Sequence, residues 1–147
     1  MIVKEKYEYQ IGEEIFQGVI CFDNEIEGSR PGVLVSHQYS GCSKLEERKC
    51  EFLAKAGYFA FAIDLYGKDV RGKTPEESLN LMNQLSEDRT VLAKRINHCL
   101  TLLKDHALVD NNKVAAIGYC FGGRCVLDLA RSGVELNLVV SFHGIYD

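Results

Sequence analysis

The feature that most constrains this chain is the stretch from Lys113 to Gly123, which reads KVAAIGYCFGG. A short apolar run leads into Gly118, and a helical pattern of apolar residues begins after Gly123. This order is typical of a strand, a sharp turn and a helix. Cys120 falls at the tip of the turn, so its thiol is the group that this local structure would present.

The glycines of this stretch have the spacing of a nucleophile elbow. Gly118 and Gly122 flank Cys120 as the glycines of the G-x-S-x-G motif flank its serine. The strained backbone of such a turn brings its neighbours so close to the nucleophile that a Cβ atom has no room. We therefore predict that Gly118, Gly122 and Gly123 shape the elbow.

The predicted position of Cys120 also favours its reactivity. At the start of a helix, the macrodipole and the unpaired backbone N–H groups stabilise a thiolate. The N–H of Phe121 points toward the place where an oxyanion would form during acyl transfer. We interpret Cys120 as a nucleophile. The alternative is a buried structural cysteine beneath a glycine-rich turn, because free cysteines are often buried.

Length and composition predict a single globular domain over residues 1–147, with 46% apolar and 26% charged residues. The net charge is −4 and no basic block stands out, so we expect no nucleic-acid partner. No stretch approaches the roughly 18 apolar residues of a membrane span, and the N-terminus lacks the apolar core of a signal peptide. We therefore expect a cytoplasmic protein without a membrane partner.

The six cysteines are scattered along the chain, and we expect them to be reduced thiols. Cys120 and Cys125 lack the C-x-x-C spacing of redox and zinc sites, and no histidine falls at ligand spacing from a cysteine pair. We expect neither a metal ion nor an organic cofactor.

Periodicity predicts the order of the elements. Residues 1–24 alternate polar and apolar side chains around Gly12, which predicts an antiparallel hairpin with one solvated face. Buried strands are then expected at 32–36, 58–65, 114–117 and 136–142, with a turn at 110–112. Helices are expected at about 43–56, 74–85, 86–106 and 121–132.

Helix signals support these boundaries. Ser43 with Glu46 and Thr74 with Glu77 have the spacing of capping boxes, and Ser86 is expected to cap the longest helix. One side of the first helix is marked by Leu45, Lys49, Phe52, Leu53 and Ala56.

The alternation of strands and helices predicts a three-layer α/β fold with an open, mostly parallel sheet and an antiparallel hairpin at its N-terminal edge. Ligands bind such sheets outside the carboxyl ends of the strands. The loops 37–42 and 66–73, the elbow and His143 should gather there. Asp64, at the end of its strand, is expected to order the loop 66–73.

With these residues in place, the chain resembles the dienelactone hydrolase family of α/β-hydrolases, which use a Cys–His–Asp triad. The resemblance covers nearly the whole chain in the family's order, and G-Y-C-F-G-G is its most specific motif. The matching stretches are 32–41, 57–67, 115–123 and 139–144.

The resemblance implies that Cys120 attacks the carbonyl of a small ester or lactone and forms an acyl-enzyme that water hydrolyses. It places the oxyanion between the backbone N–H groups of Phe121 and Tyr39. The residues expected to line the substrate pocket are His37, Gln38, Tyr119 and His143.

Two departures from the family pattern matter for the chemistry. Many members carry glutamate where this chain has Gln38, and an amide cannot take up the proton of the thiol as a carboxylate can. The family also continues past the strand ending at Phe142, with the triad aspartate and histidine on later segments. We therefore expect a C-terminally truncated fold in which His143 and Asp147 do not replace that pair.

Three alternatives remain open at this stage. One is an amidotransferase-like or DJ-1-like enzyme, which also places a cysteine on a strand-to-helix elbow. Another is a non-catalytic truncated module that forms a homo-oligomer, or binds another chain, through an uncovered C-terminal sheet edge. The third is a dinucleotide-binding turn, which the side chain of Cys120 disfavours.

Overall fold

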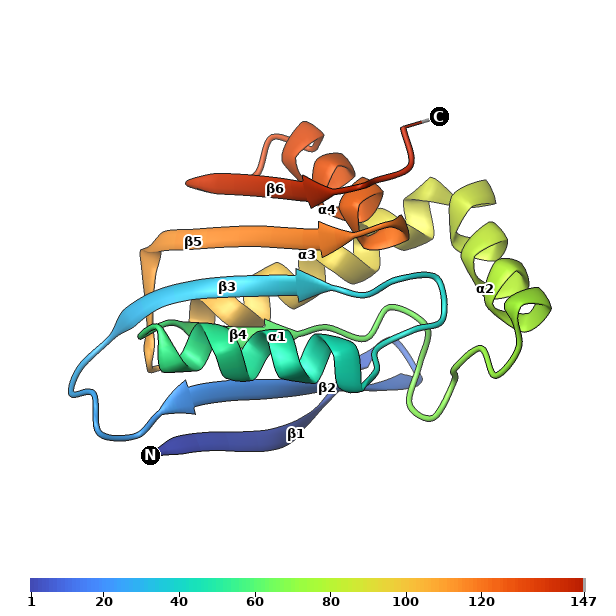
Figure 1. The fold of residues 1–147 in the computed structure, drawn as a ribbon. Helices are drawn as coiled ribbons and strands as arrows, with labels where there is room; N and C mark the ends of the chain where they lie inside the picture. Colours follow the sequence, from blue (N-terminus) through green and yellow to red (C-terminus); the bar gives the residue numbers. More distant parts are fainter. Residues whose placement is uncertain (147) are drawn as a thin grey trace.

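The computed structural model describes residues 1–146 as a mixed β-sheet with helices on both faces (Figure 1). The strands are β1 (Ile2–Ile11), β2 (Glu14–Asp23), β3 (Arg30–Ser36), β4 (Phe59–Ala62), β5 (Val109–Tyr119) and β6 (Leu138–Phe142). The helices are α1 (Lys44–Lys55), α2 (Pro75–Glu87), α3 (Arg89–Asp105) and α4 (Phe121–Arg131). Within these residues, no helix combines the length and apolar character of a membrane span.

The strands lie in the order β1-β2-β4-β3-β5-β6. β2 pairs antiparallel with β1 and with β4, whereas β4, β3, β5 and β6 run parallel to one another. This confirms the predicted open, mostly parallel sheet with an antiparallel hairpin at one edge. The carboxyl ends of the parallel strands share one end of the sheet, where Figure 1 also places the start of α4.

The hairpin is less solvated than predicted. Phe16 and Ile20 of β2 belong to the larger apolar core, while Val19 and Cys21 pack in a smaller core on the opposite face. α1 packs against one face of β2, and the other face contributes side chains to the larger core, so both faces are covered along much of the strand. The prediction of one solvated face was wrong for this strand.

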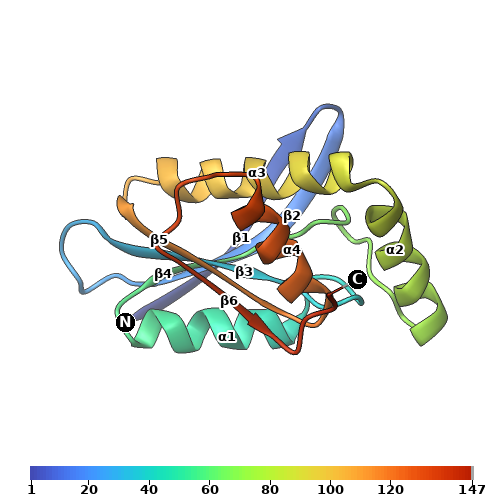
Figure 2. The ribbon, with the colours of Figure 1, turned by 90° about the horizontal axis from the view of Figure 1, so that it is seen from above.

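Helices cover both faces of the sheet. Figure 2 shows α1 on one side, and α3 and α4 on the other. Leu34 enters the core beneath α3 and α4, whereas Val33 and Val35 enter the core beneath α1. The alternation follows from the period of two in a strand. It explains why this short run is apolar throughout.

The capping signals hold for α1 and in part for α2. At Ser43 both arms of the capping box are present, and Gly57 follows the helix with a φ of +94°. The Thr74 hydroxyl accepts from the N–H of Glu77, but the Glu77 carboxylate accepts from the N–H of Lys73. The second capping box therefore has one of its two reciprocal bonds.

The predicted cap of the longest helix was wrong. Ser86 lies in the last turn of α2 and donates to the Met82 carbonyl, 2.8 Å away. The cap of α3 is Asp88, whose carboxylate accepts from the N–H groups of Thr90 and Val91 at 3.1 Å. Asp88 is an equally good capping residue type, and two candidates this close cannot be separated by residue type alone.

The buried side of α1 also differs from the prediction. Glu46, Cys50 and Ala54 face the sheet, whereas Phe52 is 71% exposed and Leu45 is also exposed. The predicted turn at 110–112 lies inside β5, where the register with β3 shifts between Pro31 and Gly32.

Candidate active site

The elbow after β5 has the strained backbone that its glycines predict. Cys120 adopts a φ of +55° and a ψ of −119°, outside the regions that residues with a side chain usually occupy. Such conformations cost on the order of 1–3 kcal/mol and persist where the surroundings impose them. Here the Cys120 N–H donates to the Phe142 carbonyl, and the Cys120 carbonyl accepts from the Gly123 N–H, both at 3.0 Å.

Each elbow glycine occupies a position without room for a side chain. A Cβ atom at Gly118 would lie 2.0 Å from the Gly122 carbonyl oxygen, and one at Gly122 would lie 2.3 Å from the Ser36 carbonyl oxygen. A Cβ at Gly123 would lie 2.3 Å from the Ser141 Oγ. Real Cβ contacts are not this short, so the three glycines let β3, β5 and β6 converge on the elbow.

Cys120 is the accessible thiol of the chain. It is partly exposed, whereas the other five cysteines are buried. Burial raises the pKa of Cys99 to about 12 and raises the pKa values of Cys42 and Cys125 further. These three thiols therefore stay protonated near neutral pH.

The loop after β3 lies against the elbow. β3 and β5 are parallel neighbours in which Ser36 pairs with Gly118, so both loops leave the sheet at the same level. The rings of Tyr66 and Phe121 stack with centroids 6.2 Å apart, and the His37 ring lies 4.7 Å from that of Tyr66. The three predicted loops therefore meet at the carboxyl end of the sheet.

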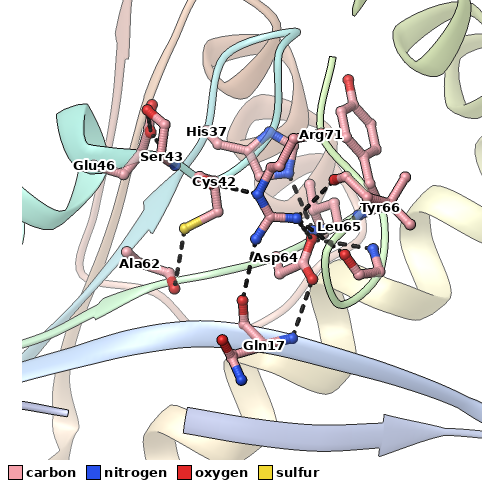
Figure 3. A network of polar contacts seen from close by, with 12 residues as sticks. Gln17, His37, Cys42, Ser43, Glu46, Ala62, Asp64, Leu65, Tyr66 and Arg71 are labelled. Atoms are coloured by element: carbon pink, nitrogen blue, oxygen red, sulfur yellow. Dashed lines mark hydrogen bonds and ion pairs between the residues drawn. The ribbon is translucent and has the colours of Figure 1, made fainter. Parts of the chain in front are cut away.

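Asp64 orders the loop 66–73, as predicted. Its buried carboxylate accepts from the N–H groups of Tyr66 and Gly67 at 3.0 and 3.1 Å, and from the Gln17 N–H at 3.1 Å (Figure 3). It also pairs with the Arg71 guanidinium at 3.3 Å. These contacts leave Asp64 as a structural group rather than a catalytic acid.

Arg71 and Tyr66 join the loop 66–73 to the loop after β3. Arg71 Nε donates to the Cys42 carbonyl (Figure 3). The Gly72 N–H donates to the Ser40 carbonyl at 2.9 Å. The Tyr66 hydroxyl donates to the Tyr39 carbonyl at 2.8 Å. Sequence reasoning missed both residues. The available signal was an arginine inside a loop that follows a buried aspartate.

His37 lies beneath the site and is fully buried. Its Nε2 accepts from the Leu65 N–H at 3.1 Å, and its Nδ1 lies 2.6 Å from the Gln38 carbonyl oxygen. Burial lowers the pKa of His37, so the neutral ring is favoured. Both ring nitrogens are engaged within the protein, and neither is free to take a proton from Cys120.

Gln38 and Tyr39 occupy the loop directly after His37, and both side chains are partly exposed. The Gln38 N–H donates to the Glu46 carboxylate at 3.4 Å, which links the loop to the start of α1. No acceptor among residues 1–146 takes the N–H of Tyr39. The N–H of Phe121 is the first of α4 and has no partner within the helix.

Tyr119 and His143 lie on the side of the elbow toward α1 and β6. Tyr119 stacks on Phe142 with centroids 4.8 Å apart, while the exposed His143 ring lies 6.4 Å from that of Tyr119. Asp147 is outside the described residues. A hollow of about 530 Å³ is lined by Arg48, Lys49, Phe52, Leu53, Ile117, Tyr119 and Phe142. Of the four predicted pocket residues, Tyr119 lines this hollow.

Comparison with known proteins gives consistent matches. The family model described as "Dienelactone hydrolase family" matches residues 16–147. A Yersinia pestis protein named "Putative carboxymethylenebutenolidase" is 31% identical over 136 residues, which is 90% of this chain and 50% of that protein. A Bradyrhizobium protein named "Probable 2-oxo-3-(5-oxofuran-2-ylidene)propanoate lactonase" is 27% identical over 83% of this chain and 49% of its own length. The chain therefore spans about half the length of these relatives.

Solved structures agree with the fold. A dienelactone hydrolase-like promiscuous phosphotriesterase from metagenomic libraries superposes with a TM-score of 0.92 at 33% identity, over 97% of this chain and 59% of that one. A dienelactone hydrolase from Anabaena variabilis gives a TM-score of 0.73 at 25% identity, over 97% of this chain and 64% of that one.

Proposed function

The chain belongs to the dienelactone hydrolase family, and on that premise we propose that Cys120 is the nucleophile of a hydrolase that cleaves a carboxylic ester or lactone. The observation that carries this proposal is the strained elbow, which holds an accessible thiol at the start of α4. The names of the two curated relatives support a lactone as one substrate class.

The proposed reaction is acyl transfer through sulfur. The Cys120 thiolate adds to the carbonyl carbon of the substrate, and the displaced electron pair forms an oxyanion on the carbonyl oxygen. The N–H groups of Phe121 and Tyr39 donate to that oxygen. Collapse re-forms the C=O bond and breaks the bond to the alcohol oxygen, which takes up the proton that the thiol lost. Water then hydrolyses the thioester and restores the thiol.

The proton acceptor for Cys120 is not assigned to a described residue. Both ring nitrogens of His37 already form hydrogen bonds within the protein. The side-chain amide of Gln38 is not basic and cannot accept the proton of the thiol. His143 lies next to β6 but has no contact with the elbow cysteine that would order it for catalysis among residues 1–146. We propose that the family's aspartate and histidine supply this role in the whole protein.

The test is the reaction of the chain with p-nitrophenyl acetate. We expect a burst of nitrophenolate, at most one equivalent per chain, followed by little or no turnover. A Cys120→Ala variant should lose the burst. Glutamine serves as the competing substrate, because formation of glutamate would favour an amidotransferase. A burst of equal size in the variant, or none in either protein, would refute the proposed function.

A further inference from the structure

Two hydrogen bonds to its carbonyl oxygen fix the peptide group between Gln38 and Tyr39. The Gln38 carbonyl oxygen lies 2.6 Å from His37 Nδ1 and accepts from the Gly41 N–H at 3.1 Å. A carbonyl can only accept, so Nδ1 must carry the proton of this bond. His37 is therefore one of two donors that fix the direction of this carbonyl.

The Leu65 backbone sets the same tautomer. Its N–H points at His37 Nε2 from 3.1 Å, and a donor at that distance requires a lone pair on Nε2. A neutral imidazole with its proton on Nδ1 satisfies both bonds. In a charged ring, Nε2 would also carry a proton, and its N–H would face the N–H of Leu65. Burial, which lowers the pKa of His37, acts in the same direction.

A fixed carbonyl fixes the N–H across the same peptide bond. In a trans peptide the C=O and N–H bonds point in opposite directions, so the bonds to the Gln38 carbonyl aim the Tyr39 N–H away from His37. The adjoining peptides are also held. Glu46 accepts from the Gln38 N–H, and Tyr66 donates to the Tyr39 carbonyl. The Tyr39 N–H itself has no acceptor among the described residues.

The same histidine lies next to the elbow. A Cβ on Gly122 would be 2.6 Å from the His37 carbonyl oxygen, and the rings of His37 and Phe121 are 6.4 Å apart. We propose that His37 is a positioning residue that aims the Tyr39 N–H into the oxyanion site, through its Nδ1–H bond to the Gln38 carbonyl. This inference rests on the proposed function of Cys120.

The test compares two reactions of Cys120. Acylation by p-nitrophenyl acetate develops an oxyanion, whereas alkylation by iodoacetamide does not. The variant His37→Gln can place an amide at the position of Nε2, and His37→Asn can place an amide N–H at the position of Nδ1. We expect His37→Gln to slow acylation by about 10- to 100-fold. This is less than the roughly 100- to 1,000-fold cost of removing an oxyanion donor, because the variant keeps the Tyr39 N–H and loses only the bond that aims it. Alkylation should change less than about twofold, and His37→Asn should recover much of the acylation rate.

Several outcomes would overturn this inference. Equal slowing of both reactions would show a general structural role, and equal acylation rates for the two variants would show that Nδ1 has no special part. If neither variant folds, ¹⁵N NMR of the unmodified chain reports which ring nitrogen of His37 carries the proton. A proton on Nε2 alone, or on both nitrogens, would contradict the proposal. Failure of the unmodified chain to acylate while it still alkylates would instead refute the function on which the inference rests.

Discussion

At the scale of single residues, the site depends on positions where a side chain has no room. Cys120 carries the strained φ, and its glycine neighbours let three strand ends meet around it. A Cβ atom added to Gly118 or Gly122 would clash with a backbone carbonyl oxygen, which cannot rotate away as a side chain can. The G-x-C-x-G spacing predicted the turn because the close approach of Gly118 to Gly122 lies within five consecutive residues. The close approach of Gly122 to Ser36 joins the elbow to the end of β3 and forms only on folding.

A Gly122→Ala substitution tests this constraint. The new Cβ would meet the Ser36 carbonyl oxygen at 2.3 Å, so we expect a loss of about 2–4 kcal/mol in the free energy of unfolding. The measurement is urea denaturation. Gly133→Ala is the control, because its φ is +82° and no atom lies within 4 Å of the added Cβ. That variant should lose about 1 kcal/mol. Equal losses would contradict the close approach at the elbow.

The buried His37 predicts a pH dependence of stability. Burial lowers its pKa in the folded chain, so the unfolded chain binds more protons as the pH falls. The contribution of His37 to the free energy of unfolding is present above its unfolded pKa of about 6.5. Below that pH the contribution is lost by up to about 1.4 kcal/mol per pH unit. Asp64, Glu46 and Arg71 are the charged groups that act on this ring.

Urea midpoints measured from about pH 7 to about pH 5 check this prediction. The urea midpoint should fall as the pH is lowered, and His37→Gln should make this dependence on pH weaker. Some dependence should remain, because burial also lowers the pKa of His106. Carboxylates such as Asp23, with a lowered pKa, act at lower pH. A midpoint that rises toward acid would contradict the neutral ring.

At the scale of elements, parallel strands place the loops, and buried polar contacts hold them there. The capping signal at Ser43 and the helix start at Phe121 could be predicted because each depends on a few consecutive residues. Two other contacts could not be predicted from the sequence: the pairing of Asp64 with Arg71, and the hydrogen bonds to the Gln38 carbonyl. Both depend on how the loops fold around the end of the sheet. The face of α1 was wrong for a related reason. Glu46 is buried because hydrogen bonds from Ser43 and Gln38 satisfy its carboxylate.

An Asp64→Asn substitution tests the contacts between loops. It removes the charge that pairs with Arg71 and turns an N–H donor toward backbone N–H groups, so we expect a loss of about 2–4 kcal/mol in the free energy of unfolding. Acylation of Cys120 should also slow. The control is Lys68→Met in the same loop, which removes a solvent-exposed ion pair with Glu8. A control loss as large as that of Asp64→Asn would argue against a special role for the buried pair.

At the scale of the whole molecule, the alternation of strands and helices was enough to predict the sheet and the end at which the three loops of the candidate site gather. The order of strands within the sheet and the coverage of β2 by α1 depend on contacts between distant segments. The described residues also leave apolar side chains in water near the sheet edge formed by β6. Phe52, Leu138 and Phe142 are all exposed, and two of them line the hollow beside Tyr119.

This surface predicts that the 147-residue chain associates with itself. Sedimentation velocity should show a concentration-dependent increase in mass. Phe52→Lys should weaken the association, whereas Leu79→Lys, an exposed apolar position on α2, should leave it unchanged. A compact monomer at every concentration would count against this prediction.

The proposed function requires the thiol of Cys120 to take the acyl group of an ester. The most direct measurement is peptide mass spectrometry of the chain after brief reaction with p-nitrophenyl acetate at neutral pH. We expect an acetyl thioester on Cys120 and none on the five buried cysteines. Acetyl groups spread evenly over the cysteines, or found on lysines with Cys120 unmodified, would contradict it.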